Sequence, residues 1–312
     1  MKKLASTILF FFLFSVILVS LPQIRTVNAE TTAEVEVGIW LVNVEKVDLA
    51  ASSFKLDFYL WFNFDPSEIN LNEIKEFEFI NGAPTKYEIA VDSDEGYLEY
   101  RVRGDFIKTF DFTHYPFENQ ELSIQLEHKY LNSSQLVYLS DASSTIDPEA
   151  TVTGWNIVNF ETIIDEHSYG AESYSRFNSK VILERPIVSA FIKSVLPISV
   201  ITTIALLAFF ISPNNFAQRI GLGVTTLLSA TAFHLSLVNG IPPTGYLTFA
   251  DRMMIGIYVL FLYNLSVSVY IMRRVDKKKI EEAEKFKQKA LKLLPILIIT
   301  VIIVLILTHL SF

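Results

Sequence analysis

The chain has 312 residues, of which 51% are hydrophobic and 19% are charged, and its formal net charge is −8. Its mean hydropathy of +0.35 is high for a soluble protein and predicts a membrane-embedded part. The absence of cysteine excludes disulfide frameworks, thiolate metal sites and cysteine nucleophiles.

The first 29 residues have the organisation of a secretory signal peptide. Two lysines follow Met1, residues 4–21 form an apolar run, and Val27-Asn28-Ala29 offers a small-residue cleavage site. The apolar run is long for a signal peptide, so an uncleaved membrane anchor is the alternative interpretation. We predict cleavage after Ala29, because the segment that follows is polar and strand-like.

Residues 30–186 are predicted to form an extracellular all-β sandwich. Apolar and polar residues alternate over 35–41, 54–60, 98–103 and 122–127, as they do in half-buried strands. Turn-forming pairs separate these stretches, and no convincing amphipathic helix interrupts them. With 29 acidic and 11 basic residues the segment has a net charge of −18, which argues against nucleic acid as a partner.

The composition changes after Pro186, and residues 187–312 are predicted to form a transmembrane four-helix bundle. The spans cover about residues 187–211, 219–238, 253–272 and 291–310, and a cytoplasmic linker of residues 273–290 joins the last two. Pro197 and Pro295 fall inside spans, which membrane bundles tolerate. Lys193, near the start of the first span, either snorkels to the membrane interface or pairs with the β-domain; we favour snorkelling.

The distribution of charge predicts the orientation in the membrane. Residues 273–292 contain nine Lys or Arg and four Asp or Glu, so the positive-inside rule places this segment in the cytoplasm. Residues 240–250 contain no Lys or Arg, as expected of an outside loop. Together with the signal peptide, these features predict a protein of the plasma (inner) membrane whose N-terminal domain and C-terminus lie outside the cytoplasm.

The second span has one distinctive face. The residues found every three or four positions along this face are small or hydroxylated at its start and aliphatic in the middle. The last one carries an amide. Such a stripe suits either a tightly packed helix or a pore-lining helix with a hydrophobic constriction at Leu228. His234 lies off the stripe and is interpreted as a packing residue. The stripe consists of Gly221, Thr225, Leu228, Ala232, Leu235 and Asn239.

The segment RIGLGVTTLL, from Arg219 to Leu228, resembles the second transmembrane helix of the pentameric ligand-gated ion channels, the Cys-loop or Pro-loop receptors. The sequence of this segment is most similar to that of anion-conducting glycine and GABA receptors. The resemblance implies that this helix lines the pore, that Leu228 forms the gate, and that selectivity is set near Ala217, Gln218 and Arg219. Cation-conducting relatives have an acidic ring just before the arginine, whereas Ala217 and Gln218 are uncharged. We therefore predict a weakly anion-selective or poorly selective pore, with a cation-conducting member of the same family as the alternative.

A second stretch, residues 111–120, resembles the signature loop of the same family. Its core is Tyr115-Pro116-Phe117-Glu118, with Glu in place of the usual Asp, and positions 108 and 122 carry no cysteine, as in prokaryotic members. The resemblance implies that Arg185 pairs with Glu118, with Asp48 as a further candidate partner. It also implies that the loop after the second span receives the motion of the β-domain, through Pro242, Pro243, Thr244 and Tyr246.

The ligand pocket is less well marked. The Trp-any-Pro motif of the family's first binding loop is missing, which puts a neurotransmitter-type pocket in doubt. Tyr130, Tyr169 and Tyr174 fall in the other expected binding loops, where aromatic walls attract cationic amines; ordinary surface tyrosines are the alternative. Residues 165–167 are interpreted as a solvated hairpin tip, and neither a metal nor a cofactor is expected.

These features predict a homopentameric ligand-gated ion channel. Each subunit would combine the β-sandwich with the membrane bundle, and five copies in a ring would close around the second span. The expected partners are membrane lipids and an unknown small-molecule or ion agonist. A non-conducting membrane sensor with the same fold is a rival interpretation, and an enzyme is disfavoured because no catalytic motif appears.

Overall fold

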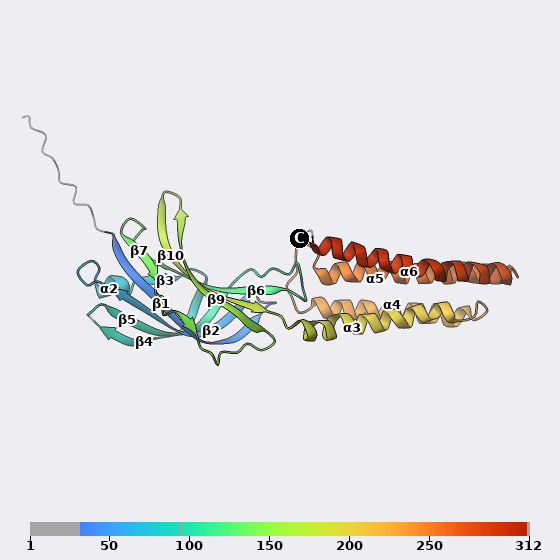
Figure 1. The fold of residues 1–312 in the computed structure, drawn as a ribbon, viewed down its shortest axis with the longest axis horizontal. Coiled ribbons are helices and arrows are strands. Elements are labelled where there is room, and N and C mark those ends of the chain that lie inside the picture. Colours follow the sequence, from blue (N-terminus) through green and yellow to red (C-terminus); the bar gives the residue numbers. More distant parts are fainter. Residues whose placement is uncertain (1–31, 94, 311–312) are drawn as a thin grey trace, which may run out of the picture.

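The computed structural model describes residues 32–93 and 95–310. The predicted signal peptide lies outside the described residues. Figure 1 shows an elongated molecule with a β-domain at one end and long helices that run away from it. The two parts meet where Glu184 ends the last strand and Ile187 begins the first long helix.

Two sheets form the β-domain, which confirms the predicted all-β sandwich. One has the strand order β4-β5-β2-β1-β7, with β8 beside β1, and the other has the order β3-β6-β10-β9. Among the strands that the structure describes, only β7 and β8 pair in parallel, both with β1. The strands are β1 (Ala33–Asp48), β2 (Ser53–Phe64), β3 (Phe77–Phe79), β4 (Gly82–Ser93), β5 (Tyr97–Ile107), β6 (Asn119–His128), β7 (Leu136–Ser140), β8 (Thr145–Ile146), β9 (Asn156–Tyr169) and β10 (Glu172–Glu184).

The core lies between the two sheets and follows from the period-two pattern. In β1 the side chains of Val35 and Val37 are fully buried, whereas Glu36 between them is exposed. Aromatic rings join the sheets: Phe58 of β2 meets Phe79 of β3 edge to face, with ring centroids 6.1 Å apart. Burial of these apolar faces is the main favourable contribution to folding of the β-domain.

One short helix, α2 (Leu71–Ile74), was missed from the sequence. Its N-cap is Asn70, whose side-chain oxygen accepts from the backbone N–H of Asn72 and Glu73 at 3.0 and 3.1 Å. The Glu73 carboxylate accepts in return from the backbone N–H of Asn70. This capping box stabilises a helix too short to show any apolar periodicity.

Within residues 32–93 and 95–310, four helices are long and apolar enough to cross a membrane. Helices adjacent in the chain pack against one another. They are α3 (Ile187–Leu206), extended by the 3₁₀ turn η1 (Leu207–Phe210), α4 (Phe216–Val238), α5 (Phe249–Asp276) and α6 (Ile280–Leu310).

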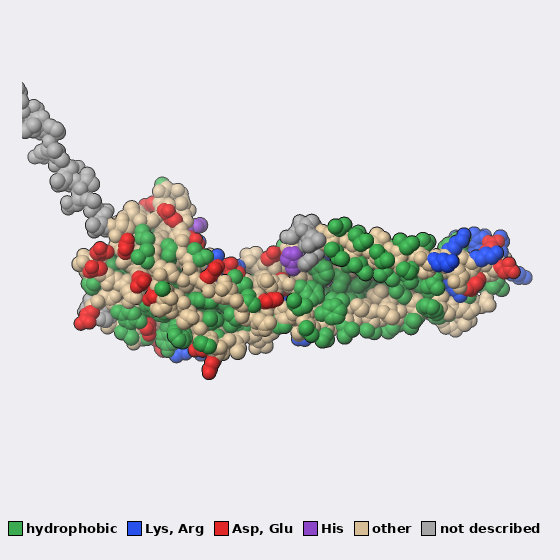
Figure 2. All heavy atoms as spheres, viewed as in Figure 1, with side chains coloured by type: hydrophobic (Ala, Val, Ile, Leu, Met, Phe, Trp, Pro, Cys, Tyr) green, Lys and Arg blue, Asp and Glu red, His purple; other side chains and the backbone are tan. Residues whose placement is uncertain are grey.

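The segment expected to be a linker, residues 273–290, is largely helical. α5 continues to Asp276, and α6 begins at Ile280. Ion pairs three residues apart, Lys279–Glu282 and Lys287–Glu284, hold the first turns of α6 at N–O distances of 2.9 and 2.8 Å. Such pairs favour helix beyond the apolar span. Figure 2 shows the basic side chains gathered at this far tip of the molecule.

His128 is a buried histidine that shapes the loop after β6. Its side chain is 3% exposed. Nδ1 accepts from the backbone N–H of Tyr130 and Leu131 at 3.1 and 2.9 Å, so Nε2 carries the proton and donates to the Glu73 carbonyl at 2.8 Å. Burial lowers the pKa of His128 below its ordinary value. The loop that carries Tyr130 therefore depends on a neutral imidazole.

This arrangement predicts a pH-dependent stability. The unfolded chain takes up a proton on His128 near its ordinary pKa of about 6.5, before the folded chain does, so stability should decrease as pH falls below that value. His128→Gln should lower the thermal midpoint at pH 7.5 and flatten its decline between pH 7.5 and 5.5. The matched control is His167→Gln, at an exposed histidine. Equal pH profiles for the wild type and both variants would contradict the assignment.

Candidate functional site

The loop between β5 and β6, residues 108–118, connects the β-domain to the membrane helices. The backbone N–H groups of Phe249 and Ala250, at the start of α5, donate to the carbonyls of Thr113 and Tyr115 at 2.9 and 3.0 Å. The Tyr115 hydroxyl donates to the carbonyl of Leu237, near the end of α4, at 3.0 Å. The loop thus contacts α5 through backbone groups and the end of α4 through the Tyr115 side chain.

The expected pair between Arg185 and Glu118 is present at this junction. Nε and one terminal nitrogen of Arg185 donate to the same Glu118 oxygen at 3.0 and 2.7 Å. The guanidinium also faces the rings of Trp155 and Tyr115, with its central carbon 4.3 and 5.6 Å from the ring centroids. Arg185 directly precedes Pro186, the N-cap of α3. A charge pair therefore links the loop to the entrance of the first membrane helix.

Burial sets the electrostatics of this pair. Glu118 is 3% exposed, and burial raises the pKa of its carboxyl above the ordinary value, while the hydrogen bonds from Arg185 oppose the rise. The second carboxylate oxygen is buried without a hydrogen-bond partner in the described part of the chain. Asp48 does not join the pair: it accepts from Lys46 at 2.7 Å and from the backbone N–H of Ala51 at 3.0 Å.

The loop between α4 and α5 also meets the β-domain. The Tyr246 hydroxyl accepts from the backbone N–H of Phe112 at 2.9 Å and donates to the Asp111 carboxylate at 3.2 Å. Thr244 Oγ1 donates to the Tyr246 carbonyl at 2.7 Å, and Pro242 and Pro243 line a cavity of about 580 Å³ beside it. Tyr246 therefore joins the α4–α5 loop to the signature loop.

Two polar features of the junction were not foreseen. Arg252 of α5 donates to the Thr113 carbonyl at 2.8 Å and to the Thr308 carbonyl of α6 at 2.7 Å. His234, interpreted from the sequence as a packing residue, lies 3.1 Å from both the Tyr258 hydroxyl and an Asp251 oxygen. Both partners come from α5, so no local pattern in α4 indicated them.

The stripe on α4 is exposed along its whole length in the single chain. Leu228 and Leu235 are 65% and 60% exposed, whereas Gly223, Thr226 and Ala230, which alternate with the stripe, are buried. The other members, Gly221, Thr225, Ala232 and Asn239, are exposed as well, as are Ala217 and Gln218 before the stripe. One face of α4 is thus packed within the subunit and the other is left free.

Arg219 does not share that free face. Its side chain is fully buried, and one terminal nitrogen donates to the Ile211 carbonyl at 3.0 Å. Nε and the other terminal nitrogen have no hydrogen-bond partner among the residues that the structure describes. The selectivity region expected at 217–219 is therefore divided, with two uncharged exposed residues followed by a buried cation.

The predicted binding tyrosines fall into two groups. Tyr169 and Tyr174 face each other across the β9–β10 hairpin, with ring centroids 5.8 Å apart, and Arg176 donates to the Tyr169 hydroxyl at 3.2 Å. Tyr130 is 70% exposed and contacts the His128 ring instead. Asp165 and Glu166, near the hairpin tip, accept from Asn178 and Ser133.

Comparison with known proteins adds independent findings. The family model for the neurotransmitter-gated ion-channel transmembrane region matches residues 194–301. A proton-gated ion channel from Gloeobacter violaceus is 24% identical over 80% of this chain and 76% of its own length. Gamma-aminobutyric acid receptor subunits beta-4 from Gallus gallus and rho-2 from Homo sapiens are 24% and 23% identical over 62% of this chain. The chain spans 40% and 43% of those two subunits.

The matched region contains most of the four long helices, so the protein is integral to the membrane. The alignment with the bacterial relative extends over most of the chain. The signature loop lies against the ends of two of those helices, and the sequence contains no cysteine. The chain is thus similar to pentameric ligand-gated ion channels in its transmembrane region and over most of its length, and it has no cysteine that could form a signature-loop disulfide.

Proposed function

We propose that this protein is a homopentameric ligand-gated channel in which an extracellular agonist opens a central pore lined by α4. Residues 30–186 form the ligand-binding domain, and residues 187–312 form the pore domain. The observation that carries the proposal is the exposed stripe of α4, whose opposite face is buried in the subunit. Members of the family are channels and not enzymes, so the enzyme interpretation is set aside.

The pore follows from the properties of the stripe. α4 is the least apolar of the four membrane helices, and hydroxyls and small residues line its free face beside Leu228 and Leu235. Five such faces around an axis give a polar inner end and two rings of leucine. A ring of leucines can close a narrow pore by excluding water. α6, the most apolar helix and the least buried, suits the lipid-facing position.

The agonist signal has a direct route to the pore. The buried Arg185–Glu118 pair joins β10 and α3 to the signature loop, and that loop contacts α5 and the end of α4. An agonist that binds the β-domain more tightly in one arrangement of this junction shifts the channel toward the corresponding pore state.

We assign the agonist site to the β-domain, with Tyr130, Tyr169 and Tyr174 as the candidate contacts. Tyr169 and Tyr174 form an aromatic corner suited to a cationic amine. Relatives are named as a proton-gated channel and as gamma-aminobutyric acid receptor subunits, so protons and amines are the first stimuli to test. The decisive experiment records current from the purified protein in planar bilayers across both classes. Absence of current under every stimulus would favour the non-conducting sensor.

The orientation belongs to the same proposal. The basic tip at the end of α5 and the start of α6 lies on the cytoplasmic side. The β-domain and the C-terminus then lie outside, as an extracellular agonist requires.

The first prediction concerns the gate. Leu228→Ser should hydrate the closed ring, which gives a resting leak or a several-fold lower agonist concentration for half-maximal current. Leu262→Ser is the matched control, because Leu262 of α5 is similarly exposed, at 68%, but lies off the stripe. Unchanged resting current and dose response at normal surface expression would exclude Leu228 as the gate.

The second prediction concerns coupling. Arg185→Glu leaves Glu118 buried without its partner, a loss that costs about 3–5 kcal/mol in buried pairs. We expect loss of gating or assembly, and partial recovery when Glu118→Arg is added. The comparison pair is Arg101 and Asp57, 3.0 Å apart in the β-domain; Arg101→Glu should leave gating intact. If the double-mutant cycle shows no interaction energy between positions 185 and 118, the pair does not couple.

The third prediction concerns selectivity. No acidic residue lies at 217 or 218, and the charge of −18 on residues 30–186 is spread over a wet domain and screened within about 8 Å at physiological salt. The pore should therefore be weakly anion-selective or poorly selective. Gln218→Glu should shift the reversal potential under a KCl gradient toward the potassium equilibrium potential, whereas Gln218→Asn should not. A wild-type reversal potential already near that of potassium would contradict this prediction.

A further inference from the structure

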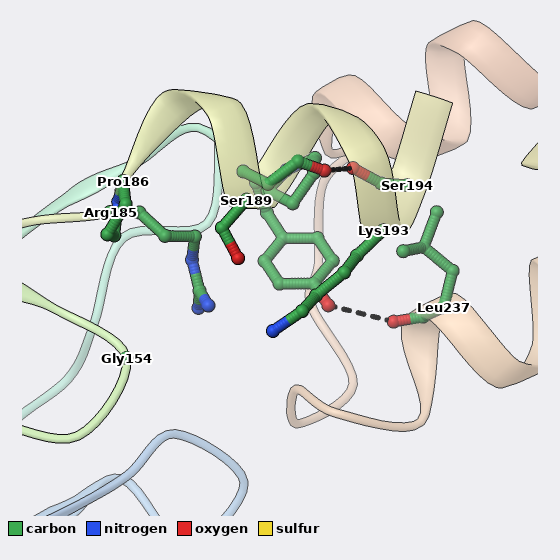
Figure 3. Close-up of a pocket in the computed structure, with 10 residues that line it drawn as sticks. Gly154, Arg185, Pro186, Ser189, Lys193, Ser194 and Leu237 are labelled. Carbon is green, nitrogen blue, oxygen red and sulfur yellow. Dashed lines mark hydrogen bonds between the residues drawn. The ribbon is translucent and has the colours of Figure 1, made fainter. Parts of the chain in front are cut away.

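A cavity of about 190 Å³ lies between the signature loop, the start of α3 and the end of α4. Tyr115, Arg185, Ser189, Lys193 and Leu237 are among its lining residues. Figure 3 shows Arg185, Ser189 and Lys193 extending toward the same space. These three residues are spaced by four, so they follow one face of the chain as it enters the helix. A single water needs only about 10–15 Å³, so the cavity is large enough for a bigger polar group.

The cavity carries an unbalanced positive charge. Glu118 neutralises Arg185, but Lys193 forms no ion pair with any residue in the part of the chain that the structure describes. Ser189 adds a hydroxyl one turn from Lys193. The N-cap of α3 is Pro186, which provides no side-chain hydrogen bond. The positive end of the helix dipole therefore lies at a first turn that has no capping side chain. Each of these features favours an anion.

The cavity lies at the end of α3 that adjoins the β-domain, where a membrane span approaches the headgroup layer. Lys193 is six residues into α3, roughly 9 Å along its axis, and headgroup layers are several ångströms thick. The neighbouring side chains of Val188, Phe191 and Ile192 are large, apolar and exposed, as expected of a surface in contact with acyl chains. An anion that reaches Lys193 from the membrane therefore carries an apolar tail.

We propose that this cavity binds the phosphate group of an anionic phospholipid from the leaflet next to the β-domain. Lys193 supplies the unpaired charge and Ser189 donates a hydrogen bond. Arg185 forms the wall toward the β-domain, so the bound lipid contacts the residue that links the two domains. This reassigns Lys193 from a snorkelling residue to a ligand-binding one, and it is independent of whether the pore conducts.

The test measures the reactivity of Lys193 itself. The full-length protein in detergent is treated with an amine-acetylating reagent, and acetylation is mapped by mass spectrometry of its peptides. Phosphatidylglycerol should slow acetylation of Lys193 about fivefold, the factor expected for one lysine near an anionic surface. Phosphatidylcholine should protect it less, and Ser189→Ala should weaken the protection. Exposed Lys46, in the β-domain, is the internal control.

Further measurements identify the source of the phosphate group. Glycerol phosphate added without lipid should not protect Lys193 if the acyl chains contribute, and equal protection would instead assign the site to a free phosphate compound. In native mass spectrometry, Lys193→Gln should weaken binding of the first phosphatidylglycerol molecules about fivefold, and Lys193→Arg should restore it. Unchanged reactivity of Lys193 with phosphatidylglycerol would overturn the proposal. If Lys193 is already unreactive before lipid is added, a neighbouring subunit covers it, and this result would also overturn the proposal.

Discussion

The architecture depends on one buried pair of a carboxylate and a guanidinium at the domain junction. Glu118 is almost completely removed from water, and an ionised carboxylate in such a place is stable only with a cation and hydrogen bonds close by. Arg185 provides both, and it lies at the point where β10 ends and α3 begins. The signature loop, the last strand and the first membrane helix are therefore held at one point. The backbone contacts of the loop with α5 add positional precision to that attachment.

The second constraint is that only one of the two faces of α4 is packed within the subunit. Gly223, Thr226 and Ala230 let α4 pack closely within the subunit; a Cβ at Gly223 would lie 2.7 Å from the Leu265 side chain. Arg219 is buried on the same helix, and no carboxylate among the described residues is hydrogen-bonded to its guanidinium. A helix with one tightly packed face and one polar face that is not packed within the subunit is suited to assembly around an axis. In such an assembly the unpacked faces contact water instead of lipid.

Much of this could be predicted from the sequence, because the strands and spans follow from strong local patterns. Alternation with period two defined the β-domain, and long apolar runs defined the four helices. The helical extension over 273–290 was missed because ion pairs such as Lys287–Glu284, rather than apolar residues, support it. The inward direction of Arg219 and the contacts of His234 depend on neighbouring helices. Spacing within α4 alone carries no information about them.

The bonds made by Arg252 have a consequence for the whole molecule. One guanidinium joins the signature loop, through the Thr113 carbonyl, to the last turns of α6, through the Thr308 carbonyl. α6 is the most apolar and the least buried of the four membrane helices, so bilayer thickness acts most directly on its tilt. A change in the tilt of α6 is therefore transmitted through Arg252 to the signature loop. In the proposed channel, the hydrocarbon thickness of the host membrane is therefore a second input to the domain junction, besides the agonist.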